Sequence, residues 1–251
     1  MTEPLFFESP LIQSEIRPLF VYHKIDESFI GGFARVYAVQ LRYAVNDRLA
    51  LIATKDGFIQ LRPRVAGLRA DGWADIAAGV KYALIDDKEA NFILTPGLKF
   101  EAPTGNSRVF QGNGEGEFNL FVSTMKGWGN FHTTASVGGR IPVDFDAETA
   151  SVNYSLQFDY YACRWFIPFA VVNGSTVLSE AKGPAFGGIE GFDLINFGAS
   201  DAAGFTQIAF GGGFRSRLLK NVDVGLAYQT GITSPKGLFD ERFSVDFIWR
   251  F

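Results

Sequence analysis

The end of the chain alternates between apolar and polar positions with a period of two. One set of alternate positions is wholly apolar and consists of Phe243, Val245, Phe247, Trp249 and Phe251. The positions between them are mostly polar and consist of Ser244, Asp246, Ile248 and Arg250. Successive side chains of a β-strand point to opposite faces, so this pattern predicts a strand with one aromatic, apolar face.

The same two-faced pattern recurs along the chain. In residues 151–161, for example, the apolar face would carry Val152, Tyr154, Leu156, Phe158 and Tyr160. We expect twelve strands in total, at residues 15–24, 34–45, 48–55, 73–85, 90–102, 115–125, 130–141, 150–161, 164–173, 205–217, 222–230 and 241–251. A transmembrane β-barrel requires segments of about ten residues of this kind, because lipid lies outside its wall and the lumen lies inside.

The connections between these segments alternate in length. Short turns are expected at 46–47, 86–89, 126–129, 162–163 and 218–221, and longer loops at 25–33, 56–72, 103–114, 142–149, 174–204 and 231–240. Outer-membrane barrels have short periplasmic turns and longer external loops, and both termini here fall on the short-turn side. The sequence therefore predicts an all-β, antiparallel transmembrane barrel formed by residues 15–251 as one domain. Residues 1–14 lack the alternation, and we expect them to form a periplasmic segment or a partial plug.

Composition excludes several other classes of protein. Hydrophobic residues make up 47% of the chain, which excludes a disordered protein. The longest stretch without charge, residues 165–179, contains Pro168 and is shorter than the ~18 apolar residues of a spanning helix. The single cysteine, Cys163, excludes a disulfide framework. The net charge of −4 lacks the excess of positive charge that is typical of proteins that bind nucleic acid. No metal-binding or nucleotide-binding motif is present, so we expect no metal and no cofactor.

The face opposite the apolar one carries charges of both signs. The inward-facing charges would be Arg42, Asp75, Lys81, Lys99, Glu101, Glu117, Asp159, Arg215, Asp223, Asp246 and Arg250. A pore that selects anions or cations would carry rings of one sign, so we expect these charges to pair across a narrow lumen. Our predicted channel lining consists of Arg42, Asp75, Lys81, Lys99, Glu101, Phe121, Asp159, Phe166, Val172, Asp223, Asp246 and Arg250.

One predicted strand is apolar on both faces. It comprises residues 165–172, and Pro168 removes a hydrogen bond from the ladder near its middle. The loop at 174–204 that follows is long and apolar, so we expect it to fold inward or to pack against the rim. We predict that this strand and this loop form and gate the path of a transported molecule.

Two short motifs resemble one family of outer-membrane proteins. Gly72, Asp75, Gly79, Lys81 and Tyr82 match a G-x-x-D-x-x-x-G-x-K-Y strand of the family assigned to the MetA pathway of phenol degradation. The run at 103–105 resembles the P-T-G that ends a strand before an external loop in that family. The resemblance implies a channel for the uptake of small, apolar or aromatic molecules, and it carries over no substrate-binding residue.

The last strand also resembles the closing strand of bacterial outer-membrane barrels. In those proteins the terminal aromatic residue is recognised by the barrel-assembly machinery. The resemblance implies that the apolar face from Phe243 to Phe251 is an assembly signal.

The predicted function is passive uptake of small hydrophobic or aromatic molecules through the outer membrane. The expected partners are lipid and lipopolysaccharide, the barrel-assembly machinery and a small-molecule substrate, without nucleic acid. The alternative is a closed structural or surface-interaction barrel without transport. An enzyme is a further alternative, because outer-membrane phospholipase A is a twelve-stranded barrel with a His and a Ser two residues apart. Here Thr134 follows His132 at that spacing, so we predict no catalytic residue.

Overall fold

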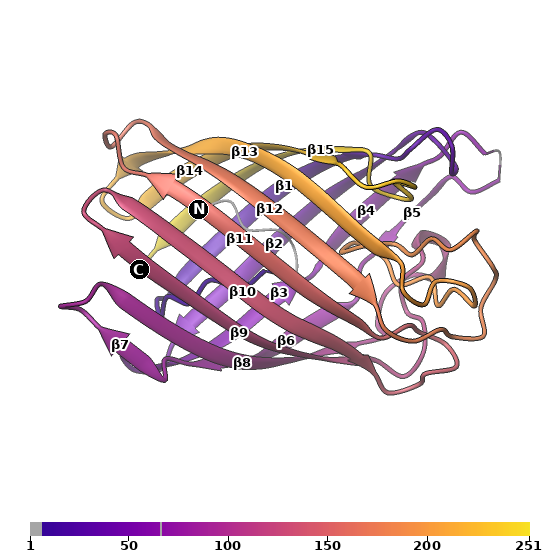
Figure 1. The fold of residues 1–251 in the computed structure, drawn as a ribbon, viewed down its shortest axis with the longest axis horizontal. Helices are drawn as coiled ribbons and strands as arrows, with labels where there is room; N and C mark the ends of the chain where they lie inside the picture. The colour runs from indigo at the N-terminus through magenta and orange to yellow at the C-terminus, as the bar shows by residue number, and fades with distance from the viewer. Residues whose placement is uncertain (1–6, 66) are drawn as a thin grey trace.

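Antiparallel β-strands follow one another around a closed wall (Figure 1). The computed structural model describes residues 7–65 and 67–251. The strands are β1 (Glu15–Lys24), β2 (Phe33–Ala44), β3 (Leu49–Lys55), β4 (Gly57–Arg62), β5 (Ala70–Trp73), β6 (Ile76–Tyr82), β7 (Ile85–Asp87), β8 (Phe92–Ala102), β9 (Glu117–Trp128), β10 (Phe131–Pro142), β11 (Ser151–Tyr160), β12 (Ile167–Val177), β13 (Thr206–Leu219), β14 (Val222–Gly231) and β15 (Glu241–Arg250). One turn of 3₁₀-helix, η1 (Ser107–Val109), lies between β8 and β9. No helix in this part of the chain is long and apolar enough to cross a membrane.

The wall closes because β1 pairs with the last strand as well as with the second. Its residues lie opposite β15 on one side and opposite β2 on the other. β3 and β4 are consecutive parts of one wall strand, since both pair with β2, and β5 and β6 are likewise parts of one strand. Among the residues that the structure describes, β7 pairs with β8 alone. The result is a closed antiparallel barrel of 12 strands, as the sequence predicted.

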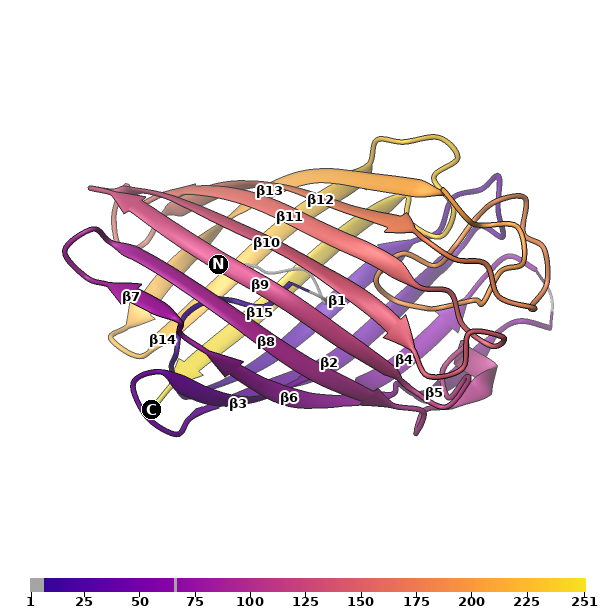
Figure 2. The same cartoon turned by 60° about the horizontal axis from the view of Figure 1, so that its bottom comes forward.

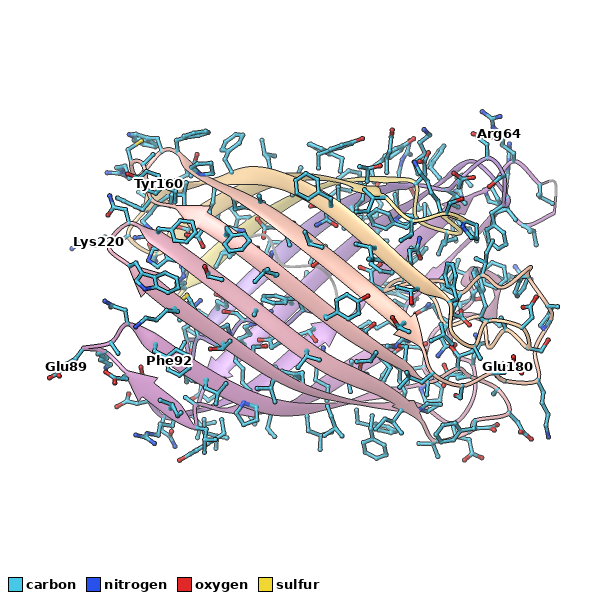
Figure 3. The ribbon with its side chains drawn as sticks, in the orientation of Figure 1. Arg64, Glu89, Phe92, Tyr160, Glu180 and Lys220 are labelled. Carbon is cyan, nitrogen blue, oxygen red and sulfur yellow. The ribbon has the colours of Figure 1, made fainter. Side chains whose placement is uncertain are left out.

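Large apolar side chains cover the outside of the wall (Figure 3). On the last strand, Phe243, Phe247 and Trp249 are between 40% and 47% exposed, and Phe251 is 67% exposed. The residues between them on β15, such as Arg242 and Asp246, are buried inside. The predicted faces of this strand are therefore correct, and its role as an assembly signal stays a prediction.

The connections differ between the two ends of the barrel (Figure 2). Short turns join the strands at one end, and the long loops gather at the other. Several predicted boundaries differ from the structure by a few residues, and two predicted strands differ most. The strand predicted at 48–55 continues through β4 to Arg62, and the strand predicted at 164–173 is β12, Ile167–Val177. Both differences shorten the loops that follow, because each strand extends further toward the loop end than its apolar pattern indicated.

The predicted faces of β12 are reversed. Phe169 and Val171 are buried inside, and with Ala227 they form a small apolar cluster. Val172 lies opposite Leu156, whose side chain is on the outer surface, and Phe166 is 48% exposed just before the strand. Phe166 and Val172 therefore do not line the lumen. In a strand that is apolar on both faces, the two sets of alternate positions do not differ in polarity. The sequence pattern therefore cannot show which face points into the lumen.

We predict that two neighbouring positions of β11 differ in their tolerance of charge. Leu156 is on the outer surface and 39% exposed, whereas Gln157 points inward and is 1% exposed beside a cavity. Leu156→Arg should destabilise the barrel by about 2–4 kcal/mol if position 156 lies near the bilayer midplane, because the charge then faces hydrocarbon. Gln157→Arg should cost much less, since its side chain leaves the lipid. Urea unfolding in lipid vesicles measures both, and equal losses would contradict the assigned faces.

Candidate functional site

The segment that precedes β1 enters the lumen and is bound there. The Glu8 carboxylate accepts hydrogen bonds from Arg42 Nε at 2.7 Å, from Arg42 Nη2 at 2.8 Å and from Lys81 Nζ at 2.7 Å. Lys81 also donates to the Ser9 carbonyl at 2.7 Å, and Thr95 Oγ1 donates to the Pro10 carbonyl at 2.7 Å. Of the plug predicted at 1–14, residues 1–6 lie outside the described residues, while residues 7–10 occupy the middle of the barrel.

Further ion pairs join adjacent or next-but-one strands along the inner wall. Asp246 of β15 binds Arg17 of β1 at 2.5 Å and Arg215 at 2.9 Å. Other wall pairs include Arg140–Glu117 at 2.7 Å, Arg250–Asp223 at 2.5 Å and Lys55–Glu101. Removing one member of a buried pair typically costs about 3–5 kcal/mol, because the other charge is left buried without its partner. The mixed signs of the lumen thus correspond to cross-strand pairing, as the sequence predicted.

The other predicted lining residues occupy different parts of the interior. Asp75 is buried between β5 and β6, where its carboxylate accepts from the Gly105 amide at 2.8 Å and from the Gly112 amide at 3.0 Å. It therefore fixes the loop after β8 instead of facing an open channel. Phe121 lies inside, and Lys99 Nζ lies 5.8 Å from the centre of its ring. Asp159 lies near the short-turn end, where its Oδ1 is 2.9 Å from Nδ1 of His132.

The loop end of the barrel is filled by an apolar core. Its buried members from the wall and the loops are Val21, Ile25, Ala34, Val36, Ile59, Leu61, Ala74, Val109, Leu194, Ile195 and Leu238. Leu194 and Ile195 come from the loop between β12 and β13, so this loop folds inward, one of the two arrangements predicted. Of the segment 165–172, Phe166 and Val172 face outward, whereas Ile167 and Phe169 line a cavity inside the barrel, and a gate formed by this segment stays a prediction.

Polar contacts fasten this loop to the wall. Asp193 pairs with Arg242 of β15, with Nη1 and Nη2 each 2.5 Å from a carboxylate oxygen. Burial alone would raise the pKa of Asp193, but the Arg242 guanidinium beside it holds the pKa below its usual value. Arg242 Nε also donates to Nδ1 of His23 at 3.2 Å, and Arg140 donates to the Phe192 carbonyl at 3.3 Å. We call the Asp193–Arg242 pair the loop latch.

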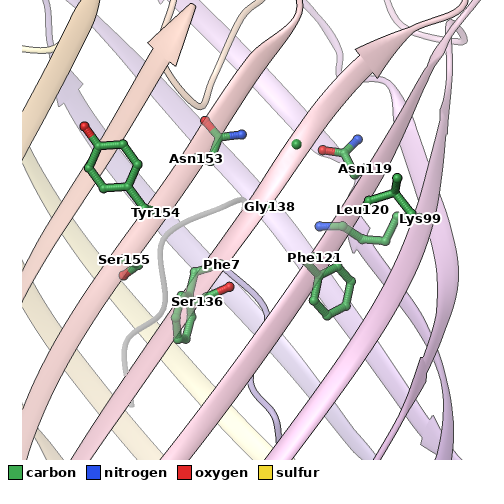
Figure 4. Close-up of a pocket in the computed structure, with 11 residues that line it drawn as sticks. Phe7, Lys99, Asn119, Leu120, Phe121, Ser136, Gly138, Asn153, Tyr154 and Ser155 are labelled. Carbon is green, nitrogen blue, oxygen red and sulfur yellow. The ribbon is translucent and has the colours of Figure 1, made fainter.

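Cavities inside the barrel are found at its centre and toward its short-turn end. The smaller one, about 20 Å³, lies at the centre between Phe7 and the β9–β11 wall, and Lys99, Phe121 and Ser136 line it (Figure 4). The larger one, about 230 Å³, lies toward the short-turn end and is lined by His132, Gln157, Asp159 and Phe169 among others. Space for a small molecule is thus concentrated at the end away from the apolar loop core.

A larger hollow, about 1080 Å³, lies on the outer face of the wall over β14, β15, β1, β2, β4 and β5. We call it the wall groove. Its lining is mostly apolar and includes Phe20, Tyr37, Val39, Trp73 and Phe247.

The hydrogen-bonded ladder is interrupted beneath the wall groove. Between β1 and β15 the paired residues pass from Ile16 and Trp249 to Leu19 and Asp246, and Pro18, which has no N–H, lies in this gap. On β2, Leu41 lies opposite Ala53 but Ala38 lies opposite Gly57, so one extra residue is accommodated around Asp56. A β-bulge of this kind disrupts the local ladder and bends the strand.

Several residues of this interior were not among the predicted ones. Arg17 and Arg140 lie at inward positions of predicted strands, so continuing the alternation through 15–24 and 130–141 would have identified them. Glu8 and Asp193 lie outside any strand, and no periodic signal indicates their position. Within the described residues there is no group of three or more His, Cys, Asp and Glu side chains that could hold a metal.

Comparison with known proteins shows similarity at the level of structure. No protein-family profile matches the chain, and no curated protein matches it. The chain is similar to the crystal structure of an outer membrane channel from Pseudomonas putida F1, with 13% identity, 100% of both chains covered and a TM-score of 0.69. It is also similar to the NanC porin, with 8% identity over 95% of this chain and 100% of that chain, at a TM-score of 0.58.

A third solved structure belongs to another class of outer-membrane protein. The translocator domain of the autotransporter NalP from Neisseria meningitidis is 10% identical, with 98% of this chain and 90% of that chain covered and a TM-score of 0.57. The fold is therefore that of outer-membrane β-barrels. Because channels, porins and a translocator share it, the fold alone does not assign an activity.

We predict that the stability of the loop end depends on the protonation of Glu148, which lies between β10 and β11. Burial, together with the negative charge of Glu117, raises the pKa of Glu148 from 4.5 to about 7. The protonated carboxyl is therefore favoured by the folded state, and its stabilising contribution is lost as the pH rises from about 4.5 through 7. Glu148→Gln should reduce the difference in urea midpoint between pH 5 and pH 8. An unchanged pH dependence in the variant would contradict the prediction.

We predict that opening the loop latch increases ion conduction along the barrel axis. Arg242→Met leaves Asp193 buried without its guanidinium, which favours movement of the loop toward water. Conductance in planar bilayers should rise several-fold, as it should after deletion of residues 183–197. The control is Lys182→Met on the same loop, which breaks an exposed pair with Asp146 of the β10–β11 loop. If neither the latch variant nor the deletion conducts more than the control, this loop does not close the axis.

Proposed function

We propose that this protein is a passive channel of the bacterial outer membrane that admits small apolar molecules through its wall. The observation that carries the proposal is the wall groove above an interrupted part of the ladder. A hollow lined by Phe20, Tyr37 and Trp73 offers an apolar molecule a place on the outer surface of the wall. The similarity to an outer membrane channel supports the general class, and the apolar outer surface suits contact with lipid.

The route would pass between β1 and β15. The wall groove contacts Val245, Asp246 and Phe247 of β15 from outside, while the larger inner cavity contacts Ile248 and Arg250 of the same strand from inside. The gap in pairing at Pro18 lies along this stretch. Only a wall without its full set of backbone hydrogen bonds separates the two spaces, so this is where the least backbone pairing would have to be broken.

The barrel axis offers a poorer route for such a molecule. From the loop end it would have to displace the apolar core, and at the centre it would meet Glu8, Arg42 and Lys81 with side chains at most 1% exposed. Disrupting buried, paired charges is costly. The proposed entry from lipid avoids both barriers. Its biological use would be to admit molecules that the lipopolysaccharide layer resists.

The same filled axis favours the alternative function, a closed structural or surface-interaction barrel. The apolar core at the loop end, the loop latch and the residues from Phe7 to Pro10 would then only stabilise the fold. The two hypotheses predict different effects of filling the wall groove with a bulky side chain. If the barrel is closed, uptake of apolar molecules should not change, whereas a channel through the wall should take up less.

We predict that filling the wall groove slows uptake of apolar molecules. Val39 lines the wall groove and is 40% exposed, so Val39→Trp should occupy part of its volume without entering the lumen. Uptake of the dye N-phenyl-1-naphthylamine by Gram-negative cells that express the protein should fall several-fold. The assay uses intact cells because an unmodified lipid bilayer passes this dye without a protein.

A matched variant separates filling of the wall groove from a general effect of a surface tryptophan. Val137 is an outward valine of β10, 51% exposed and away from the wall groove. Val137→Trp should take up dye like the unmodified protein, at equal amounts of folded, heat-modifiable barrel. If dye uptake is the same for both variants and for cells without the protein, the closed barrel is favoured and the channel is not supported.

A further inference from the structure

The larger inner cavity has the size of a site for a single-ring molecule. Its volume is about 230 Å³, and an engineered cavity of about 150 Å³ is enough for benzene. Its apolar lining includes Met125 of β9, Ile167 and Phe169 of β12 and Ile248 of β15. It lies inside the barrel next to the gap between β1 and β15, and Ile167 and Phe169 belong to the segment 165–172 that the sequence analysis singled out.

Gln157 gives this cavity an unsatisfied polar group. Its side chain is 1% exposed, and within the described part of the chain neither its Oε1 nor its Nε2 has a hydrogen-bond partner. Asp159, two residues further along β11, binds His132 through Oδ1 at 2.9 Å, while its buried Oδ2 is without a partner among the same residues. Buried polar groups in folded proteins almost always have hydrogen-bond partners. A ligand in this cavity could provide the partners that Gln157 and Asp159 lack among the described residues.

The charges around the cavity are paired with one another. Asp223 binds Arg250 at 2.5 Å and lies 3.5 Å from Arg217. Arg215 is engaged by Asp246 at 2.9 Å. A charged ligand would have to compete with these pairs, and an anion would also meet the Asp159 carboxylate. A neutral ligand has neither difficulty.

We infer that this cavity binds a neutral molecule with one ring-sized apolar body and one group that both donates and accepts a hydrogen bond. A primary carboxamide is the simplest such group. Its carbonyl would accept from Gln157 Nε2, one N–H would donate to Gln157 Oε1, and the other N–H would donate to Asp159 Oδ2. The ring would pack against Phe169, Ile167 and Ile248. This inference rests on the proposed function, since it names the kind of molecule that the inner end of the route would hold.

Recognition of this kind discriminates strongly between related molecules. A site built to hydrogen-bond a ligand rejects the analogue that lacks the group, because its own buried polar atoms are then left unpaired. Toluene, which has the ring alone, should therefore bind more weakly than benzamide. Benzoate has a similar shape but is anionic and has no N–H, so it should also bind more weakly.

The test is binding of benzamide, toluene and benzoate to the full chain in detergent micelles, measured by ligand-observed NMR. We expect benzamide to bind at least about tenfold more tightly than either analogue, and Gln157→Leu to weaken benzamide binding about tenfold or more. The control is Gln229→Leu, another inward glutamine that is 5% exposed but lies outside this cavity. That variant should bind benzamide like the unmodified protein.

Three results would overturn the inference: no benzamide binding by the unmodified protein, equal affinity for the three molecules, or equal losses in Gln157→Leu and Gln229→Leu. The comparison of the three molecules needs no variant, so it holds even if Gln157→Leu fails to fold. The outcome is separate from that of the proposed function. Dye uptake that depends on Val39 without selective benzamide binding would leave the channel in place and remove only this site.

Discussion

The structure depends on the closure of its backbone hydrogen-bond ladder. In hydrocarbon each backbone N–H and C=O must find a partner within the protein, so a sheet that spans a membrane cannot leave an open edge. β1 meets this requirement by pairing with β15 on one side and β2 on the other. A barrel of 12 strands is narrow, so inward side chains are crowded together. The pairing of inward charges, such as Arg215 with Asp246, follows from this confinement.

Because of the same constraint, a gap in the backbone hydrogen-bond ladder is unfavourable in the membrane, and this wall contains such gaps. Pro18 interrupts pairing between the first and last strands, and the extra residue near Asp56 interrupts it between β2 and the β3–β4 strand. Both interruptions lie beneath the wall groove. At the first of them, the buried pair of Arg17 and Asp246 crosses the same two strands at 2.5 Å. A side-chain ion pair thus stabilises a seam that the backbone joins only partly, and an ion pair between two side chains can be rearranged more locally than a continuous ladder.

The sequence was sufficient to predict the wall but not what fills it. Strand positions and faces followed from the alternation, because lipid and lumen impose opposite chemistry on alternate residues. The prediction was wrong for Phe166 and Val172, where both faces are apolar and the period carries no information about direction. The positions of Glu8 and Asp193 could not be predicted, since each lies in a non-periodic segment and is fixed only by a distant arginine, Arg42 or Arg242. Arg140 was accessible to the same reasoning as Arg42 and was overlooked.

The two closures of the axis differ in the forces that hold them, and this difference argues for a route through the wall. At the loop end Leu194 and Ile195 are buried in an apolar core, and at the centre Glu8 is held by Arg42 and Lys81. Opening the axis far enough for an apolar molecule would require both to be undone, one against the hydrophobic effect and the other against buried charge pairing. Opening the seam at Pro18 would break fewer backbone hydrogen bonds than opening another part of the wall, and Arg215 would remain beside Asp246 to limit the cost of moving Arg17. The proposed route through the seam would therefore leave the filled axis undisturbed.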